Sequence, residues 1–212
     1  MANKFVLFDF DGVIADSFAL SFDVATQMHP HLMKDEYIAL WDGNIYEMDA
    51  KLSCGPDCKP SREDYFNVFT ARRGEIGIVP GSKEMVQSLA VDHTLCVISS
   101  SISMDIMAFL ERHDMAEYFS DVLGSDAHES KVEKINTILS RYEVMAQDAV
   151  FVTDTLGDML EAEKSGIGAI GVAWGFQNAE RLARGNPYSI VHAPADLPGN
   201  IAKYFAKEKS TM

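Results

Sequence analysis

The sequence contains two pairs of closely spaced aspartates. Asp9 and Asp11 lie two positions apart, and Asp154 and Asp158 lie four positions apart. Carboxylate oxygens are the hard ligands that Mg²⁺ prefers, and a carboxylate can also act as a nucleophile or carry a proton. If the fold brings the two pairs together, they form a candidate site for metal-assisted or acid–base chemistry.

Hydroxyl groups and one lysine occupy comparable positions along the chain. Ser99 and Ser100 follow an apolar run, and Lys131 comes shortly after another such run. Hydroxyls can hold anionic oxygens, and an ammonium group can balance their charge. These groups would complement the aspartates in a site for an anion.

Each of these groups, taken alone, also has a structural explanation. An Asp-x-Asp-Gly sequence can be a solvated turn, and Asp154 and Asp158 can offset the partial positive charge at the start of a helix. Ser99 and Ser100 can cap a helix, and a lysine at such a position usually lies in solvent. The joint order of the groups favours a shared site.

The elements that would position these groups are short apolar runs, which are typical of strands buried on both faces. Amphipathic, helix-like stretches separate the runs, and this alternation predicts an α/β fold with a parallel sheet. The predicted strands are Phe5–Phe8, Thr94–Ile98, Asp121–Leu123, Ala149–Val152 and Ala169–Val172. The predicted helices are Lys83–Val91, Met104–His113, Val132–Tyr142 and Leu156–Ser165. Since ligand sites in such sheets form beyond the carboxyl ends of the strands, we expect the polar groups to meet at one edge.

One segment interrupts the alternation. Between Phe18 and Val79 there is no clear buried strand, only amphipathic stretches and a loop, with turn signals at Asp11-Gly12 and Pro80-Gly81. We therefore predict a core of residues 1–17 and 80–212. Residues 18–79 are expected to form a small helical cap, inserted after the first strand.

The composition restricts the partners. With 18 Lys and Arg against 32 Asp and Glu, the chain of 212 residues has a formal net charge of −14, which disfavours nucleic acid and anionic membranes. An anionic ligand would need a local cation. No apolar run approaches the roughly 20 residues of a spanning helix. Three cysteines cannot all pair within the chain, and its first residues are unlike a cleaved signal peptide, so we expect a cytoplasmic protein.

Four segments, in order, resemble the four motifs of the haloacid dehalogenase-like hydrolase superfamily. Motif I is similar to the segment from Phe5 to Ser17, which holds Asp9-Phe10-Asp11-Gly12, and motif II to Ile98-Ser99. Lys131 resembles the lysine of motif III, and the segment from Val152 to Asp158 resembles motif IV. The cap and the segment from Gly171 to Phe176 are similar to the phosphoglycolate phosphatase-like branch. The resemblance covers nearly the whole chain and implies a Rossmann-like core with a helical cap of the C1 type.

The resemblance implies a phosphoric monoester hydrolase that works through an aspartyl-phosphate. Asp9 would be the nucleophile, and Asp11 would be the general acid and then the general base. Mg²⁺ would be held by Asp9, Asp154 and Asp158, together with the backbone carbonyl of Asp11. An acid at the second aspartate favours phosphoryl transfer over dehalogenation, because only an alkoxide leaving group needs a proton.

The remaining motif residues would bind the phosphoryl group. Lys131 would balance its charge, and the Ser99 hydroxyl would hold its oxygens together with backbone N–H groups near Ser100 and Gly12. The chain departs from the common motifs at three positions, with Ser100 where Asn is usual, Val132 where Pro is usual and Thr153 where Gly is usual. None of these departures removes a reacting group, but they weaken an assignment to one named phosphatase.

The expected partner is a small phosphorylated metabolite, for which phosphoglycolate is the example that the family suggests. The cap would choose the leaving group, and its candidate contacts, most of them expected to be solvated, are Gly43–Tyr46, Lys51, Arg62, Arg72 and Arg73. Two other functions stay open. One is a sugar-phosphate mutase of the same superfamily, and the other is a non-enzymatic regulator that binds a phosphorylated ligand. The sequence indicates no oligomeric state.

Overall fold

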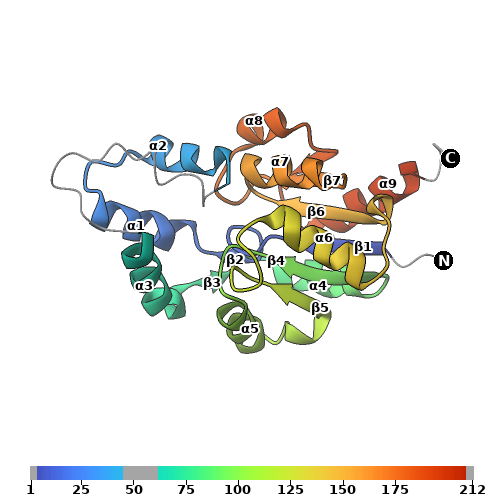
Figure 1. The fold of residues 1–212 in the computed structure, drawn as a ribbon, viewed down its shortest axis with the longest axis horizontal. Coiled ribbons are helices and arrows are strands. Elements are labelled where there is room, and N and C mark those ends of the chain that lie inside the picture. The colour runs from blue at the N-terminus through green and yellow to red at the C-terminus, as the bar shows by residue number, and fades with distance from the viewer. Residues whose placement is uncertain (1–3, 45–61, 209–212) are drawn as a thin grey trace.

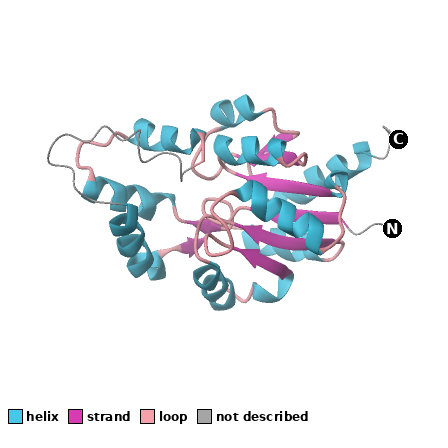
Figure 2. Ribbon diagram, viewed as in Figure 1, coloured by secondary structure: helices cyan, strands magenta, loops and turns pink. Residues whose placement is uncertain are grey.

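A computed structural model describes residues 4–44 and 62–208 of the chain. Its main sheet has six parallel strands in the spatial order β5-β4-β1-β6-β7-β8 (Figures 1 and 2). The strands of this sheet are β1 (Lys4–Phe8), β4 (His93–Ile98), β5 (Phe119–Leu123), β6 (Ala149–Thr153), β7 (Gly168–Val172) and β8 (Ser189–Val191). A parallel sheet with connecting helices is the α/β, Rossmann-like architecture that the sequence predicted.

Helices cover both faces of this sheet. Their bounds are α4 (Ser82–Ala90), α5 (Ser103–Arg112), α6 (Lys131–Arg141), α7 (Leu156–Lys164), α8 (Ala179–Leu182) and α9 (Leu197–Glu208). Short 3₁₀ turns, including η1 (Leu40–Asp42) and η3 (Arg73–Glu75), join some of the elements. Buried side chains of α4, α5 and α9 pack on one face, and those of α6, α7 and α8 pack on the other.

The central strand shows why these segments form buried strands. In β1, Val6 and Phe8 pack into the core on one face, while Phe5 and Leu7 pack into the core on the other. Successive side chains of a strand point to opposite faces, so a strand covered on both sides must be apolar at every position. This requirement explains why a continuous apolar run predicted the strand.

All five predicted strands and all four predicted helices are present, with ends shifted by at most two residues. Three strands and two helices were not predicted. Strands β2 (Ala15–Asp16) and β3 (Gly77–Ile78) have two residues each, and β8 has three, too few for a hydrophobic pattern. Helices α8 and α9 lie in a segment for which no helix was predicted.

Within the proposed cap, the described residues form the helices α1 (Phe18–Met28), α2 (Lys34–Ala39) and α3 (Arg62–Arg72). They stand to one side of the sheet, at the end opposite the two termini (Figure 1). Strands β2 and β3 pair antiparallel at the two ends of this insertion and tie them together. The boundary at residues 18–79 stays a proposal that this short sheet supports.

In the part of the chain that the structure describes, no helix has both the length and the apolar character needed to cross a membrane.

The backbone conformation just after α7 can be tested by substitution of Gly166. Gly166 has a φ of +73°, which is left-handed, and no atom lies within 4 Å of the place a Cβ would take. We expect Gly166→Ala to lower the free energy of unfolding by about 1–2 kcal/mol, since only glycine adopts this conformation without strain. Urea unfolding measures the change. Gly199→Ala, in α9 and equally uncrowded, is the control and should not destabilise the protein. Equal losses in both variants would contradict this explanation.

Candidate active site

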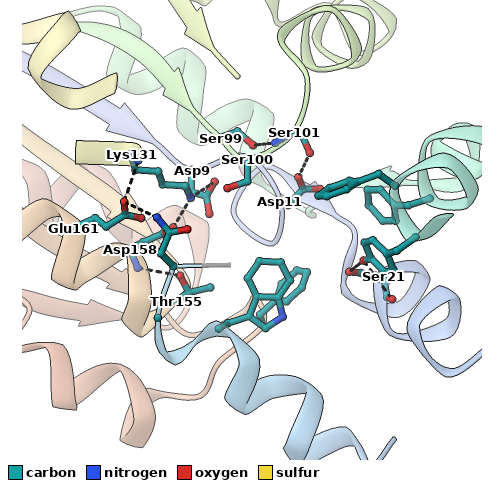
Figure 3. A pocket seen from close by; sticks show the side chains of 17 residues that line it. Asp9, Asp11, Ser21, Ser99, Ser100, Ser101, Lys131, Thr155, Asp158 and Glu161 are labelled. Carbon is teal, nitrogen blue, oxygen red and sulfur yellow. Dashed lines mark hydrogen bonds and ion pairs between the residues drawn. The ribbon is translucent and has the colours of Figure 1, made fainter. Parts of the chain in front are cut away.

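Most of the predicted site residues line one cavity at the carboxyl ends of β1, β4 and β6 (Figure 3), whereas Gly12 and Asp154 are not among its lining residues. Its walls come from the core and from the proposed cap. The core contributes Asp9, Asp11, Ser99, Ser100, Ser101, Lys131, Thr155, Asp158, Glu161 and Phe176. The segments from residue 18 to 79 contribute Ser21, Trp41, Gly43, Asn44, Tyr65, Phe66 and Phe69.

The centre of the site is a buried cluster of charges around Lys131, the first residue of α6. Its Nζ lies 3.0 Å from Asp9 Oδ1 and 2.6 Å from Asp158 Oδ2. The backbone N–H of Asp9 also donates to the carbonyl of Val152 in β6, at 2.9 Å. Three elements far apart in the sequence are thus joined through one ammonium group.

Burial and charge divide these groups into different states. Burial raises the pKa of Asp9 well above its ordinary value, although Lys131 acts in the opposite direction. Burial alone would also raise the pKa of Asp158. The charge of Lys131 and the hydrogen bonds that the Asp158 carboxylate makes lower that pKa below its ordinary value. Burial would lower the pKa of Lys131, but the two carboxylates raise it. Lys131 therefore forms an ion pair with both carboxylates, the closer one with Asp158, and the raised pKa of Asp9 indicates that this ammonium group does not fully offset the burial of Asp9.

Asp154 is fully buried beside this cluster. Its Oδ2 accepts a hydrogen bond of 2.6 Å from the backbone N–H of Phe176, and its Oδ1 has no partner. Burial raises the pKa of Asp154 to about 7. A Cβ at Gly12 would lie 2.0 Å from Oδ2, and one at Gly175 would lie 2.1 Å from it, so both glycines are needed for the close approach. Gly12, at a φ of +79°, also makes the turn after β1, as predicted.

The donor set fits a hydrated magnesium ion. Among residues 4–44 and 62–208, no three His, Cys, Asp or Glu side chains are grouped as a complete metal cage. Mg²⁺ usually keeps several waters and needs only one or two carboxylates. Asp9 and Asp154 supply two, and the orphaned Oδ1 of Asp154 is a buried acceptor without a donor. Asp158 is already paired with Lys131, so direct ligation by Asp158 stays a prediction.

Asp11 lines the cavity on the side of the cap. Both Asp9 and Asp11 lie beyond the end of β1, which stops at Phe8. Asp11 Oδ2 accepts a hydrogen bond of 2.6 Å from Ser101 Oγ, which itself accepts one of 2.6 Å from Arg73. Asp11 Oδ1 is buried and has no hydrogen-bond partner.

Ser99 and Ser100 line the cavity at the end of β4. The alternative that they cap a helix is wrong, because α5 begins at Ser103 and its N-cap residue is Ile102. Ser99 is buried, and its hydroxyl accepts a hydrogen bond of 3.0 Å from the N–H of Ser101. The loop after β4 thus turns its hydroxyls toward the carboxylates.

Several residues at the site were not predicted as site residues. Ser101 and Thr155, the latter within the motif IV segment, line the cavity. Glu161 accepts the N–H of Lys131 at 3.0 Å and the side-chain amide of Asn44 at 3.3 Å, so it joins α6 to the segment of the proposed cap that follows η1. Lys134, one turn after Lys131, donates to the carbonyl of Ser99 at 2.6 Å. Its helical spacing from Lys131 was the available signal.

The departure at Thr153 has a structural role. Its hydroxyl donates to Asp158 Oδ2 at 2.7 Å and so helps to stabilise the ionised carboxylate. The substitution of the usual glycine therefore supports the charge cluster.

The predicted cap contacts separate into groups. Gly43 and Asn44 line the cavity. Arg72 pairs with Asp23 and Glu75 near the surface, whereas Arg73 reaches Ser101. Ile45, Tyr46, Lys51 and the side chain of Arg62 lie outside the described residues.

Comparisons with known proteins agree with this architecture. A family model described as haloacid dehalogenase-like hydrolase matches residues 6–172. Phosphoglycolate phosphatase of Vibrio parahaemolyticus is 25% identical over 92% of this chain and 94% of its own length. The phosphoglycolate phosphatase of Synechococcus elongatus is 24% identical, over 91% of this chain and 94% of its own.

Solved structures show the same fold. A haloacid dehalogenase-like hydrolase of Streptococcus pneumoniae superposes with a TM-score of 0.80 at 18% identity, covering 94% of this chain and 98% of its own. A predicted phosphatase of Clostridium acetobutylicum gives 0.77 at 23% identity, covering 96% and 100%. The chain belongs to the haloacid dehalogenase-like hydrolase family, as its motifs predicted.

The lowered pKa of Lys134 should make the stability of the protein depend on pH. Burial, and then the nearby Lys131, lower its pKa to about 8 from an ordinary 10.5. Between these values the unfolded chain binds more protons than the folded protein, so the free energy of unfolding rises with pH. Relative to Lys134→Met, the wild-type curve should rise from pH 8 to 10 by up to about 1.4 kcal/mol per pH unit.

Urea unfolding at several pH values measures both curves. The exposed Lys203→Met is the control and should follow the wild-type slope. Parallel curves for wild type and Lys134→Met would show that the folded state does not perturb this lysine.

Proposed function

We propose that this protein is a Mg²⁺-dependent phosphatase that hydrolyses small phosphate monoesters through an aspartyl-phosphate on Asp9. The observation that carries the proposal is the buried group of Asp9, Asp154, Asp158 and Lys131, in contact with a cavity that also holds Asp11. The phosphatase class itself is confirmed by the family and by the curated relatives. The metal, the intermediate and the residue roles are our proposals.

Asp9 is the proposed nucleophile. Its carboxylate lies at the end of the central strand and borders the cavity, and its Oδ1 is 3.0 Å from the Lys131 ammonium. Attack of a carboxylate oxygen on phosphorus breaks the bond to the alcohol oxygen and leaves a mixed anhydride. Lys131 offsets the negative charge of the phosphoryl oxygens, and the Ser99 and Ser100 region provides donors to them.

Asp11 is the proposed general acid. It protonates the alkoxide as the ester bond breaks and then accepts a proton from the water that hydrolyses the anhydride. Its Oδ1 has no hydrogen-bond partner, while Oδ2 accepts a hydrogen bond from Ser101, whose hydroxyl in turn accepts one from Arg73. The different surroundings of Asp9 and Asp11 suit one carboxylate to bonding phosphorus and the other to moving a proton.

Asp9, Asp154 and the backbone carbonyl of Asp11 are the proposed holders of Mg²⁺, with Asp158 in direct contact or through water. When bound, the ion would neutralise phosphate charge as a Lewis acid. Such a cation would complete the charge compensation, because Asp9, Asp154 and Asp158 are all buried and Lys131 pairs with only two of them. The cation would keep Asp9 and Asp154 ionised despite their burial.

The two aspartates of motif I should differ in their effect on catalysis. We expect Asp9→Asn to reduce phosphate release from an aryl phosphate to background, because the amide cannot form the intermediate. Asp11→Asn should lower turnover by roughly 10²–10⁴-fold, the usual contribution of a general acid. Asp16→Asn, an exposed aspartate on β2, is the matched control and should retain full activity. Full activity of Asp9→Asn would contradict the assignment of the nucleophile.

The metal is tested by its removal. EDTA should abolish phosphate release, and added Mg²⁺ should restore it. In Asp154→Asn, the Mg²⁺ concentration for half-maximal activity should rise roughly tenfold or more, because a neutral amide replaces a buried carboxylate ligand. The exposed Asp92→Asn should keep the wild-type value. Full turnover in EDTA would overturn the metal requirement.

The other functions predict different outcomes in the same assays. A sugar-phosphate mutase returns the phosphoryl group to its substrate and requires a bisphosphate, whereas a phosphatase releases phosphate in water without one. A non-enzymatic regulator would release none. The small phosphorylated metabolite as partner and the cytoplasmic location remain predictions.

A further inference from the structure

The cavity at Asp9 has a second half that the chemistry of phosphate does not explain. Five aromatic rings line it, from η1, from α3 and from the loop after β7. They belong to Trp41, Tyr65, Phe66, Phe69 and Phe176. The rings therefore occupy the wall where the alcohol part of a phosphate ester would lie.

The rings support one another in two groups. Trp41 and Phe176 meet edge to face with centroids 5.0 Å apart, and Tyr65 stacks on Phe69 at 5.8 Å. Phe66 packs edge to face on Tyr65 at 5.6 Å. Trp41, Tyr65 and Phe66 are only half-buried, so they keep carbon surface open to the cavity. Such a wall favours an apolar group over a charged one.

The charges around the cavity act in the same direction. Its described lining has four carboxyl groups, Asp9, Asp11, Asp158 and Glu161, against one ammonium group, Lys131. Lys131 is already held between Asp9 and Asp158. A phosphoryl group and a divalent cation together bring little net charge, so the wall stays negative. A second anionic group on the alcohol part would be repelled.

Arg73 does not reverse this balance. Its guanidinium donates to Ser101 at 2.6 Å, lies 3.3 Å from Asp105 and sits over the Phe69 ring at 5.3 Å. It is not part of the cavity lining. Its charge is thus shared with Asp105 and with the hydroxyl that holds Asp11.

We infer that this enzyme selects phosphate monoesters whose alcohol part is uncharged and presents carbon to the rings, and that it discriminates against carboxylated alcohols. The inference rests on the proposed function. It differs from what the names of the curated relatives suggest, because glycolate carries a carboxylate.

Three esters of nearly equal size test the inference. They are n-propyl phosphate, 2-hydroxyethyl phosphate and phosphoglycolate, which differ in the group that would face the rings. With Mg²⁺ present, we expect kcat/KM for propyl phosphate to exceed that for phosphoglycolate roughly tenfold or more, with the hydroxyethyl ester between them. Equal values, or a preference for phosphoglycolate, would overturn the inference.

A pair of variants links the preference to the rings. Phe66→Ala should lower kcat/KM for propyl phosphate several-fold more than for phosphoglycolate, and so reduce the ratio between them. Phe22→Ala, an aromatic residue of α1 that is not among the lining residues, is the matched control and should leave the ratio unchanged. A ratio that Phe66→Ala leaves unchanged would contradict the role of the rings. If either variant fails to fold, the wild-type comparison of the three esters still decides the preference.

The outcomes separate this inference from the proposed function. Release of phosphate from none of the esters by the wild-type enzyme with Mg²⁺ would contradict the phosphatase proposal for these substrates. Release that depends on Asp9 but favours phosphoglycolate would contradict only the substrate preference.

Discussion

The contact of Lys131 with Asp9 and Asp158 is the interaction on which the site depends. Three carboxylates are buried near one another, and burying a charge without a partner is costly. One ammonium group offsets part of that cost and fixes the start of α6 against β1 and α7. The negative charge that Lys131 leaves uncompensated is the reason that we propose a divalent cation at this site.

Polar contacts connect this cluster to the proposed cap. The Asn44 amide donates to Glu161, which also holds the backbone of Lys131. On the other side, Arg73 holds Ser101, which holds Asp11. Two separate segments of the insertion therefore touch groups next to the proposed reacting atoms. A displacement of the cap would therefore change hydrogen bonds at the site, and not only its apolar packing.

The two halves of the cavity divide the task of recognition. Carboxylates, hydroxyls and Lys131 gather at the ends of the strands, where the backbone is held by the sheet. The aromatic wall comes mostly from segments of the insertion, which the sheet does not constrain. In the proposed function, this division would let the core carry the phosphoryl chemistry while the insertion selects the alcohol. A charged wall and an apolar wall favour different substrates, even when the phosphoryl site is the same.

The sequence by itself determined the sheet, its buried strands and the order of the motif residues, because a strand covered on both faces must be apolar and ligand groups follow strand ends. It also determined that Asp9, Asp154 and Lys131 would share an edge. Only the tertiary structure decided that Asp158 pairs with Lys131 and that Ser101 holds Asp11. It alone placed the aromatic rings in the cavity. These contacts join residues that are distant in sequence. The packing of the whole fold sets the distances and the burial that decide which polar groups pair. Such packing leaves no local pattern in the sequence.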